Sequence, residues 1–312
     1  MTDKKPLIIY HDNCADGFGA AWAAYKKFGA DGAEYLPMQY NDPRVSAAHD
    51  ELTFPTDVNG RDIYILDFSL PKEVTGLLSD ACMLSGTTLY IRDHHKTHFE
   101  QLGLDPAVRT QTRGFFNIDL ILDSDKSGCV LAWELFHPDV AMPEMLLLIQ
   151  DRDLWKWELD DTRDFATGLR SRPFSFAMFD MANRSTADVI NEGAAMNQLF
   201  DQQLADITAR PVPVRLLISY DKPAPTGLSI NCTPQFASEG GNVLAQLSGT
   251  FGMTWCVGEK GQVFVSLRST GDYDVSVIAK AYGGGGHKNA AGFKTTFDKL
   301  GYNGEGELEI RV

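Results

Sequence analysis

An apolar run ends abruptly in charged and imidazole side chains at residues 88–97, Thr-Leu-Tyr-Ile-Arg-Asp-His-His-Lys-Thr. The β-branched and aromatic residues of its first half are typical of a buried strand. Asp93, His94 and His95 follow at the carboxyl end of that strand. Because ligands bind outside the carboxyl ends of strands in open α/β sheets, this stretch predicts functional side chains at a sheet edge. The alternative is a polar turn whose histidines have no function.

Two earlier apolar runs end in the same way, the first before His11 and Asp16 and another at Asp67. The expected strands cover residues 6–10, 33–40, 62–67, 88–92 and 115–122, and the expected helices cover 18–25, 71–84, 129–136 and 144–157. Strands that alternate with helices indicate βαβ units. The predicted fold class is therefore α/β, with a doubly wound, mostly parallel sheet.

The last hundred residues predict a second, smaller α/β domain. Two strands at 253–257 and 262–269 flank a turn, a helix follows at 274–282, and the sequence GGGGHKNAAG occupies 283–292. A polar helix near 186–209 and the prolines after it suit a linker. The predicted divisions are a catalytic domain at 1–190, a helical linker at 191–213 and a substrate-binding domain at 214–312.

The composition limits the partners and the compartment. A net charge of −14 opposes tight binding to a long nucleic-acid duplex, but it does not oppose a small anionic substrate. The five cysteines are scattered without a CxxC pair, which predicts free thiols in a reducing compartment. The sequence contains no apolar run of membrane-spanning length, and its first residues do not resemble a signal peptide. We therefore expect a cytoplasmic protein without a membrane partner.

The groups expected at the sheet edge suit a metal site. They are His11, Asp16, Asp67, Asp93, His94, His95 and one of Asp151 and Asp153. Imidazole and carboxylate ligands without paired thiolates favour manganese, with magnesium, iron or zinc also possible. Two ions about 3.5–4 Å apart that share one carboxylate would activate water for phosphoester hydrolysis.

Four segments resemble the motifs of the DHH phosphoesterase superfamily: H-x4-DG at 11–17, Asp67 in Leu-Asp-Phe-Ser, the Asp93-His94-His95 triplet, and Asp151. The glycine-rich sequence at 283–292 resembles the signature loop of the DHH-associated domain. The superfamily includes RecJ-type single-strand exonucleases, oligoribonucleases, cyclic-dinucleotide phosphodiesterases and pyrophosphatases. The resemblance implies a catalytic domain joined by a linker to a domain that holds the substrate.

The resemblance also implies a role for each matching residue. Asp67 would bridge two metal ions, and His11 would bind the first of them. His94 and Asp151, together with Asp16, would bind the second, with Asp153 as the alternative to Asp151. His95 would contact phosphate or donate the proton to the leaving group, and Asp93 would orient a neighbouring imidazole instead of binding metal.

One position departs from the superfamily pattern. Most members carry another Asp two residues before the Asp of the Asp-Gly pair, where this chain has Cys14. The Cys14 thiolate, Asp12 or water could replace the missing oxygen ligand, and a thiolate would favour softer metals. Cys14 could equally be a packing residue. The number and identity of the metal ions therefore stay open.

The glycine-rich sequence is neither a P-loop nor a dinucleotide fingerprint. Its glycines would let the backbone approach a ligand, and a helix starting after it would offer N–H groups to an anion. A flexible loop at a helix end is the alternative. The predicted substrate-binding residues are Arg268, which would clamp a phosphate, and Gly284, Gly285, Gly286, His287, Lys288 and Asn289.

The sequence thus predicts a metal-dependent phosphodiesterase that cleaves short single-stranded oligonucleotides. A cyclic or linear dinucleotide, or a 3′-phosphonucleotide, is the rival substrate, and a pyrophosphatase is disfavoured. A non-catalytic nucleotide-binding protein is the alternative from another class, and a homodimer is possible. Trp133, Trp155 and Trp157 could stack on bases, but we expect them in the core. His49, His98 and His137 receive no role.

Overall fold

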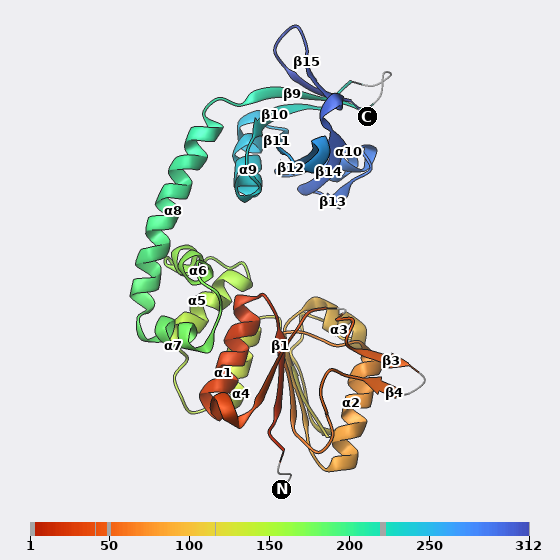
Figure 1. The fold of residues 1–312 in the computed structure, drawn as a ribbon, viewed down its shortest axis with the longest axis vertical. Coiled ribbons are helices and arrows are strands. Elements are labelled where there is room, and N and C mark those ends of the chain that lie inside the picture. The colour runs from red at the N-terminus through yellow and green to blue at the C-terminus, as the bar shows by residue number, and fades with distance from the viewer. Residues whose placement is uncertain (1–3, 41, 49–50, 116, 219–222, 312) are drawn as a thin grey trace. The chain divides into compact units, whose positions relative to one another are not determined.

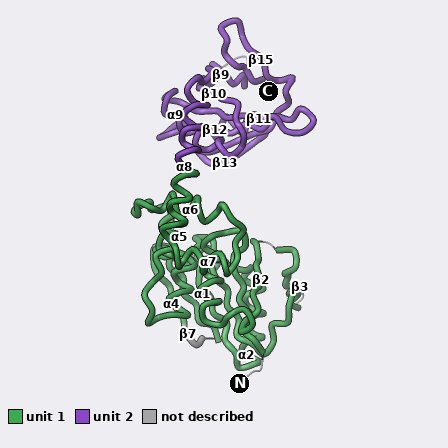
Figure 2. Tube along the Cα trace, turned by 60° about the vertical axis from the view of Figure 1, so that its left-hand side comes forward, with its two compact units in different colours: residues 1–197 green, residues 198–312 purple. Residues whose placement is uncertain are grey.

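A computed structural model describes residues 4–40, 42–48, 51–115, 117–218 and 223–311. The chain forms two compact units, residues 1–197 and 198–312, which Figure 2 shows in different colours. The division falls within the longest helix, α8 (Thr186–Thr208). The predicted linker at 191–213 covers most of α8 and the first residues of β9, and the domain limits remain a prediction. Among the helices of the described residues, none combines the length and the apolar character that crossing a membrane requires.

Unit 1 is built on a six-stranded sheet with the order β2-β1-β5-β6-β8-β7. Its strands are β1 (Leu7–His11), β2 (Glu34–Met38), β5 (Ile63–Leu66), β6 (Leu89–Asp93), β7 (Thr110–Phe115) and β8 (Ile118–Leu122), and β3 (Ser46–Ala48) and β4 (Glu51–Thr53) form a separate hairpin. Neighbouring strands are parallel throughout, except that β7 runs antiparallel to β8. The predicted mostly parallel sheet is confirmed.

Helices cover both faces of this sheet, as a doubly wound fold requires (Figure 1). The helices of unit 1 before α8 are α1 (Ala15–Gly32), α2 (Lys72–Ser85), α3 (Lys96–Leu102), α4 (Gly128–Phe136), α5 (Glu144–Asp153), α6 (Thr162–Arg170) and α7 (Phe176–Arg184). Alternate residues of β1 face different cores, since Ile8 packs with α1, α4 and α5, whereas Leu7 packs with α2 and α3. Four buried alanines of α1 allow it to lie close to α4.

One predicted strand is in fact half of a hairpin. Residues 110–122 form β7 and β8, with Asn117 in a left-handed turn at φ 56°, instead of one strand from 115 to 122. Phe116 lies outside the described residues. The polar start of β7 carries no alternation that would have marked it as a strand.

Unit 2 is built on an eight-stranded sheet with the order β13-β14-β12-β11-β10-β9-β16-β15. Its elements are β9 (Val212–Leu217), β10 (Thr226–Asn231), η1 (Pro234–Phe236), α9 (Ala237–Ser248), β11 (Phe251–Val257), η2 (Glu259–Gly261), β12 (Gln262–Ser269), α10 (Val275–Ala281), β13 (Gly285–His287), β14 (Ala290–Thr296), η3 (Phe297–Lys299), β15 (Leu300–Tyr302) and β16 (Leu308–Arg311). The predicted hairpin, β11 with β12, and the predicted helix α10 are both present.

The glycine-rich sequence differs from its prediction. Residues 285–287 and 290–296 pair as the antiparallel strands β13 and β14, so the element that follows the glycines is a strand. The expected helix N-terminus, with N–H groups for an anion, is therefore wrong. The glycines instead fit between strands, since a Cβ atom on Gly284 would lie 2.1 Å from the carbonyl oxygen of Gly292.

Candidate metal centre

Three neighbouring parallel strands of unit 1 bring their carboxyl ends to one edge of the sheet. β1 ends at His11, Asp67 directly follows β5, and β6 ends at Asp93 with His94 and His95 after it. The strands β1 and β5 lie where the winding of the sheet reverses direction, because β2 lies on the other side of β1. Such a reversal is where open α/β sheets bind their ligands. The predicted convergence of these side chains is present.

Asp67 lies at the middle of the cluster and is fully buried. Its Oδ1 atom lies 3.1 Å from Nε2 of His94, and its Oδ2 atom lies 3.5 Å from Nδ1 of His11. Within the described part of the chain, Oδ2 of Asp67 and Nδ1 of His11 are buried without a hydrogen-bond partner. Two facing, unsatisfied ligand atoms of this kind fit a bound cation. The left-handed backbone of Asp67, at φ 64°, is the kind of strain found at functional sites.

Two further carboxylates surround His94. Its Nε2 atom lies 3.6 Å from Oδ2 of Asp16 and 3.4 Å from Oδ2 of Asp153. Burial and the charge of Asp67 raise the pKa of Asp16 to about 7, and burial and the charge of Asp16 raise the pKa of Asp153 to about 6. Burial by itself lowers the pKa of His94, but its hydrogen bond to Asp67 and the neighbouring carboxylates raise that pKa to about 10. A divalent cation bound here would reduce the electrostatic repulsion between these carboxylates.

The N-terminus of α4 completes the floor of the cluster. The backbone N–H groups of Gly128 and Cys129 donate to the carboxylate of Asp16 at 2.6 and 2.9 Å. A Cβ atom on Gly128 would lie only 2.4 Å from Cβ of Asp67, so glycine is required here. Sequence reasoning expected residues 123–128 to cap the helix that follows and gave Gly128 no role in the metal site. The Ser127-Gly128 pair at the start of a helix that follows a strand was the available signal.

Asp93 accepts hydrogen bonds on both of its oxygens. Oδ1 accepts from the backbone N–H of His94 at 2.8 Å and pairs with Nδ1 of His95 at 2.8 Å, while Oδ2 pairs with Nδ1 of His98 at 2.8 Å. Burial raises the pKa of Asp93, but His95 and His98 outweigh it and lower that pKa well below its usual range. With its lone pairs occupied, Asp93 orients imidazoles and is a poor metal ligand.

His98 is a residue of the site that sequence reasoning missed. It is buried in the first turn of α3, five residues after Asp93 in the chain. His95 is half-exposed beside it. Burial by itself lowers the pKa of His95, but the hydrogen bond that its ring donates to Asp93 outweighs this effect and raises the pKa. Because Asp93 engages Nδ1, Nε2 is the His95 nitrogen available to a substrate.

The choice of Asp151 over Asp153 requires correction. The carboxylate of Asp151 accepts from the backbone N–H groups of Glu158 at 2.9 Å and Leu159 at 3.2 Å, and from the hydroxyl of Thr162. Both of its oxygens thus accept hydrogen bonds from residues that follow α5 in the chain. Asp153 is the residue that reaches His94, together with Asp16. The geometry favours the alternative ligand.

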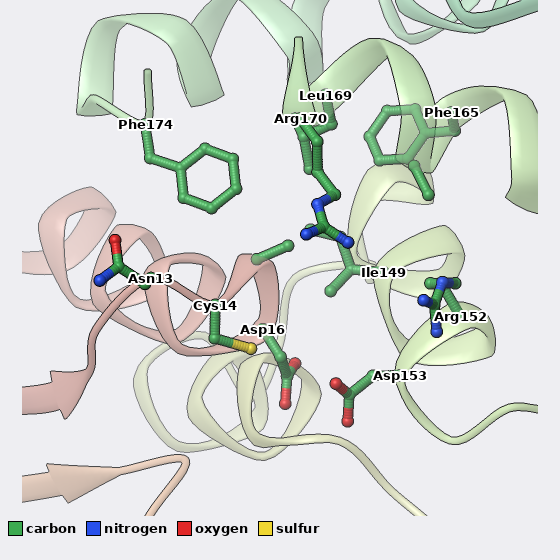
Figure 3. Close-up of a pocket in the computed structure, with 12 residues that line it drawn as sticks. Asn13, Cys14, Asp16, Ile149, Arg152, Asp153, Phe165, Leu169, Arg170 and Phe174 are labelled. Atoms are coloured by element: carbon green, nitrogen blue, oxygen red, sulfur yellow. The ribbon is translucent and has the colours of Figure 1, made fainter. Parts of the chain in front are cut away.

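Cys14 lies at the edge of the same cluster. Its Sγ atom is close to ligand atoms of His11 and Asp67, which is where an additional ligand would reach the first metal. Burial, together with the charges of Asp67 and Asp16, raises the pKa of the Cys14 thiol to about 12. A pocket opens beside it between α1, α5 and α6, and Figure 3 shows Cys14, Asp16 and Asp153 at its base with Arg152 and Arg170 nearby.

The predicted substrate-binding residues lie in unit 2. Arg268 on β12 donates to the hydroxyl of Ser238 at 2.8 Å and to the carbonyl of Leu267 at 2.9 Å. Asn289 donates to the hydroxyl of Ser269 at 3.0 Å, which fixes the turn between β13 and β14. Lys288 pairs with Asp272 at 2.7 Å.

The glycines and His287 of the same hairpin differ in what they can offer a ligand. The glycines at 284 and 286 are needed for close packing of the hairpin, because a Cβ atom at Gly286 would lie 2.5 Å from the carbonyl oxygen of Ala290. Gly285 has open space around its Cα, and His287 is exposed. Asn289, Gly284 and Gly286 therefore have structural roles. Arg268, Gly285 and His287 are accessible to a substrate.

The chain is similar to known proteins over almost its whole length. A DHHA1 domain matches residues 237–301. The chain is 29% identical to the uncharacterized protein R106 of Acanthamoeba polyphaga mimivirus, over 93% of this chain and 67% of the relative. It is 25% identical to oligoribonuclease NrnB of Bacillus subtilis, over 92% of this chain and 72% of the relative.

A solved structure shares the fold. The pGpG-specific phosphodiesterase PggH of Vibrio cholerae matches with a TM-score of 0.51 and 14% identity, and the match covers 95% of each chain. This likeness supports the α/β architecture of both units. The matched family model shows that the chain carries a DHHA1 domain at residues 237–301, and the Asp93-His94-His95 triplet beside Asp67 resembles the motifs of the DHH phosphoesterase superfamily.

Proposed function

We propose that this protein is a metal-dependent phosphodiesterase that hydrolyses short single-stranded oligonucleotides. The observation that carries the proposal is the buried cluster around Asp67, in which His11 Nδ1 and Asp67 Oδ2 face each other without hydrogen-bond partners among the described residues. The similarity to an oligoribonuclease over 92% of the chain supports the substrate class.

The residues of the cluster divide into ligands and groups that move protons. Asp67, His11, Asp16, His94 and Asp153 would hold one or two divalent ions, and manganese suits this mixture of imidazole and carboxylate. When bound, such a metal supplies an activated water and stabilises charge on the phosphoryl oxygens. We assign His95 to proton donation at the leaving oxygen, because Asp93 engages its Nδ1 atom and raises its pKa, which leaves Nε2 to face a substrate. Asp93 holds the ring of His95 in position.

Unit 2 would bind phosphate groups of the substrate through its DHHA1 domain. Arg268 presents a guanidinium that can clamp a phosphate, and the exposed His287 on β13 adds a donor. A net charge of −14 suits a substrate of few phosphates better than a long strand. A linear dinucleotide is the shortest substrate of this class, and the fold is shared with a pGpG-specific phosphodiesterase.

The test is release of mononucleotide from 5′-labelled RNA of two to about ten nucleotides with Mn²⁺, beside a His94→Ala control. We expect release that is strongest on the shortest chains, that requires the metal and that is lost in the control. Release from dinucleotides alone would assign the dinucleotide as the substrate. Folded protein that binds nucleotide but releases no product with any metal would contradict the proposal and identify a binding protein.

A further inference from the structure

Two tryptophans directly after Asp153 are exposed to solvent. The side chain of Trp155 is 66% exposed and that of Trp157 is 41% exposed, whereas Trp133 is buried at 6%. The expected core position therefore holds for Trp133 and is wrong for the other two. α5 ends at Asp153, so neither indole lies on a helix face that could pack into the core.

The backbone at Trp155 takes a conformation that normally favours glycine. The N–H of Trp155 donates to the carbonyl of Arg152 at 3.2 Å, and the N–H of Lys156 donates to the carbonyl of Asp151 at 2.9 Å. This pair of bonds is the Schellman motif that ends a helix, and Trp155 occupies its left-handed position at φ 57°. A bulky residue is strained there, and glycine is not. Stability of the fold does not explain a solvent-exposed tryptophan at this position.

The turn that carries the two indoles is held firmly. Asp151 accepts the backbone N–H groups of Glu158 and Leu159, and Nζ of Lys156 donates to the carbonyl of Asp125 at 3.2 Å. Trp157 is also left-handed, at φ 56°. Asp151 is therefore a positioning residue for this turn. An exposed aromatic surface on a fixed backbone loses little entropy when a ligand packs on it.

Arg152 contacts both indoles and lies beside the candidate metal ligands. Its Cζ atom lies 4.4 Å from the ring centre of Trp155 and 5.2 Å from that of Trp157, and the two rings meet edge to face at 5.0 Å. Arg152 also lines the pocket that contains Asp16 and Asp153 (Figure 3). The Cα atoms of Trp155 and Asp153 are at most about 7 Å apart, since two residues span no more.

We infer that Arg152, Trp155 and Trp157 form a base platform, on which Trp155 stacks with one nucleobase of the substrate. The inference rests on the proposed function and narrows its substrate class to phosphodiesters that carry aromatic bases, since an indole face offers nothing to pyrophosphate. Stacking on an aromatic side chain changes affinity by roughly 5- to 150-fold per base. It is tolerant of sequence, because every base has a π face.

The test compares the full chain with Trp155→Gly and Trp155→Phe. The probes are a pApA dinucleotide with a non-hydrolysable methylenephosphonate linkage and its two analogues, each of which lacks one base, all bound in the presence of Mn²⁺. We expect Trp155→Gly to weaken binding of the complete dinucleotide by about tenfold or more, and Trp155→Phe to keep most of the affinity. The analogue that lacks the base stacked on Trp155 should bind wild type and Trp155→Gly with the same weak affinity, because neither complex contains the stacking contact.

A matched control is Lys260→Gly, which places glycine at another exposed left-handed position, φ 55°, and should leave affinity unchanged. Thermal melting should show Trp155→Gly to be at least as stable as wild type. Unchanged affinity in Trp155→Gly overturns the platform, and so does an equal loss for both abasic analogues. If wild type hydrolyses RNA while Trp155→Gly binds normally, only the platform fails. If Trp155→Gly loses affinity while wild type hydrolyses nothing, only the proposed hydrolysis fails.

Discussion

Asp151 and Asp153 lie two residues apart at the end of α5, and their carboxylates have separate partners. Residues at this spacing on a helix point about 200° apart, so only one of the two can face the sheet edge. Asp153 faces it, with Oδ2 at 3.4 Å from Nε2 of His94, whereas Asp151 binds the backbone of Glu158 and Leu159. The two acids can therefore be separated by experiment.

The first prediction concerns these two carboxylates. Asp153→Asn should weaken manganese binding by at least about 100-fold, because mutation of residues that only hydrogen-bond to metal ligands already lowers metal affinity by about 10- to 100-fold. The same variant should change the stability of the fold little. Asp151→Asn should lower the free energy of unfolding by about 1–3 kcal/mol, because the charge is lost and one of the two acceptor oxygens is replaced by an NH2 donor. Calorimetric titration with Mn²⁺ and chemical denaturation of both variants provide the measurements. A larger loss of metal affinity in Asp151→Asn than in Asp153→Asn would restore Asp151 as the ligand.

The second prediction concerns pH. Burial acts to raise the pKa of Asp151, but the hydroxyl of Thr162 and the two backbone N–H groups outweigh it and lower the pKa. A carboxyl group whose pKa is lower in the folded state stabilises the fold above its unfolded pKa, near 4, and this contribution is lost as the pH falls. The stability difference between wild type and Asp151→Asn should therefore be full at neutral pH and shrink below about pH 4. Denaturation curves between neutral and acidic pH measure it, and a difference that grows in acid would contradict the assignment.

The third prediction concerns Gly128. In Gly128→Ala the added methyl group meets Cβ of Asp67 at 2.4 Å, so either Asp67 or the start of α4 must move. We expect a loss of about 1–3 kcal/mol of stability together with weaker metal binding. Gly76→Ala is the matched control, because it lies in α2 with open space around it and should stabilise by roughly 0.5–1 kcal/mol. Equal behaviour of the two variants would remove Gly128 from the site.

The sequence predicted the parts of the site that strand patterns specify. His11, Asp67 and His94 each follow an apolar run, and parallel strands must bring such ends together. The helix from 144 was predicted to reach Trp157, but it ends at Asp153. The prediction ran too far because tryptophan, and not the usual glycine, occupies the left-handed position after the helix. Because of this error, the sequence predicted neither that Asp151 and Asp153 point in different directions nor that Trp155 is exposed.

Contacts between distant residues were beyond the reach of sequence patterns. The hydrogen bond between His98 and Asp93 depends on the direction that α3 takes after β6. Gly128 packs on Asp67, which lies 61 residues earlier in the sequence. Periodicity reports which face of an element is buried, but it does not report which neighbour covers that face. The site is therefore predictable at its strand ends and not at its supporting helices.

The last prediction concerns Cys14, where most members of the superfamily carry Asp. Without a metal, burial beside Asp67 and Asp16 raises the pKa of its thiol to about 12, and sulfur is a poorer ligand than a carboxylate for a hard cation. Cys14→Asp should add an oxygen ligand next to His11 and Asp67 and raise affinity for Mn²⁺ and Mg²⁺ by about tenfold or more. In the absence of metal the same variant should be less stable than wild type, since a further acid joins Asp16, Asp67 and Asp153.

Cys14→Ser separates the effect of the carboxylate from that of losing the sulfur. We expect this variant to bind manganese as wild type does, and to lose affinity for zinc only if the thiolate is itself a ligand. Titration of each variant with Mn²⁺, Mg²⁺ and Zn²⁺, with melting curves at saturating metal, gives both quantities. Unchanged affinity in Cys14→Asp would mean that a ligand from this position does not reach the metal, and the first metal would then depend on His11 and Asp67.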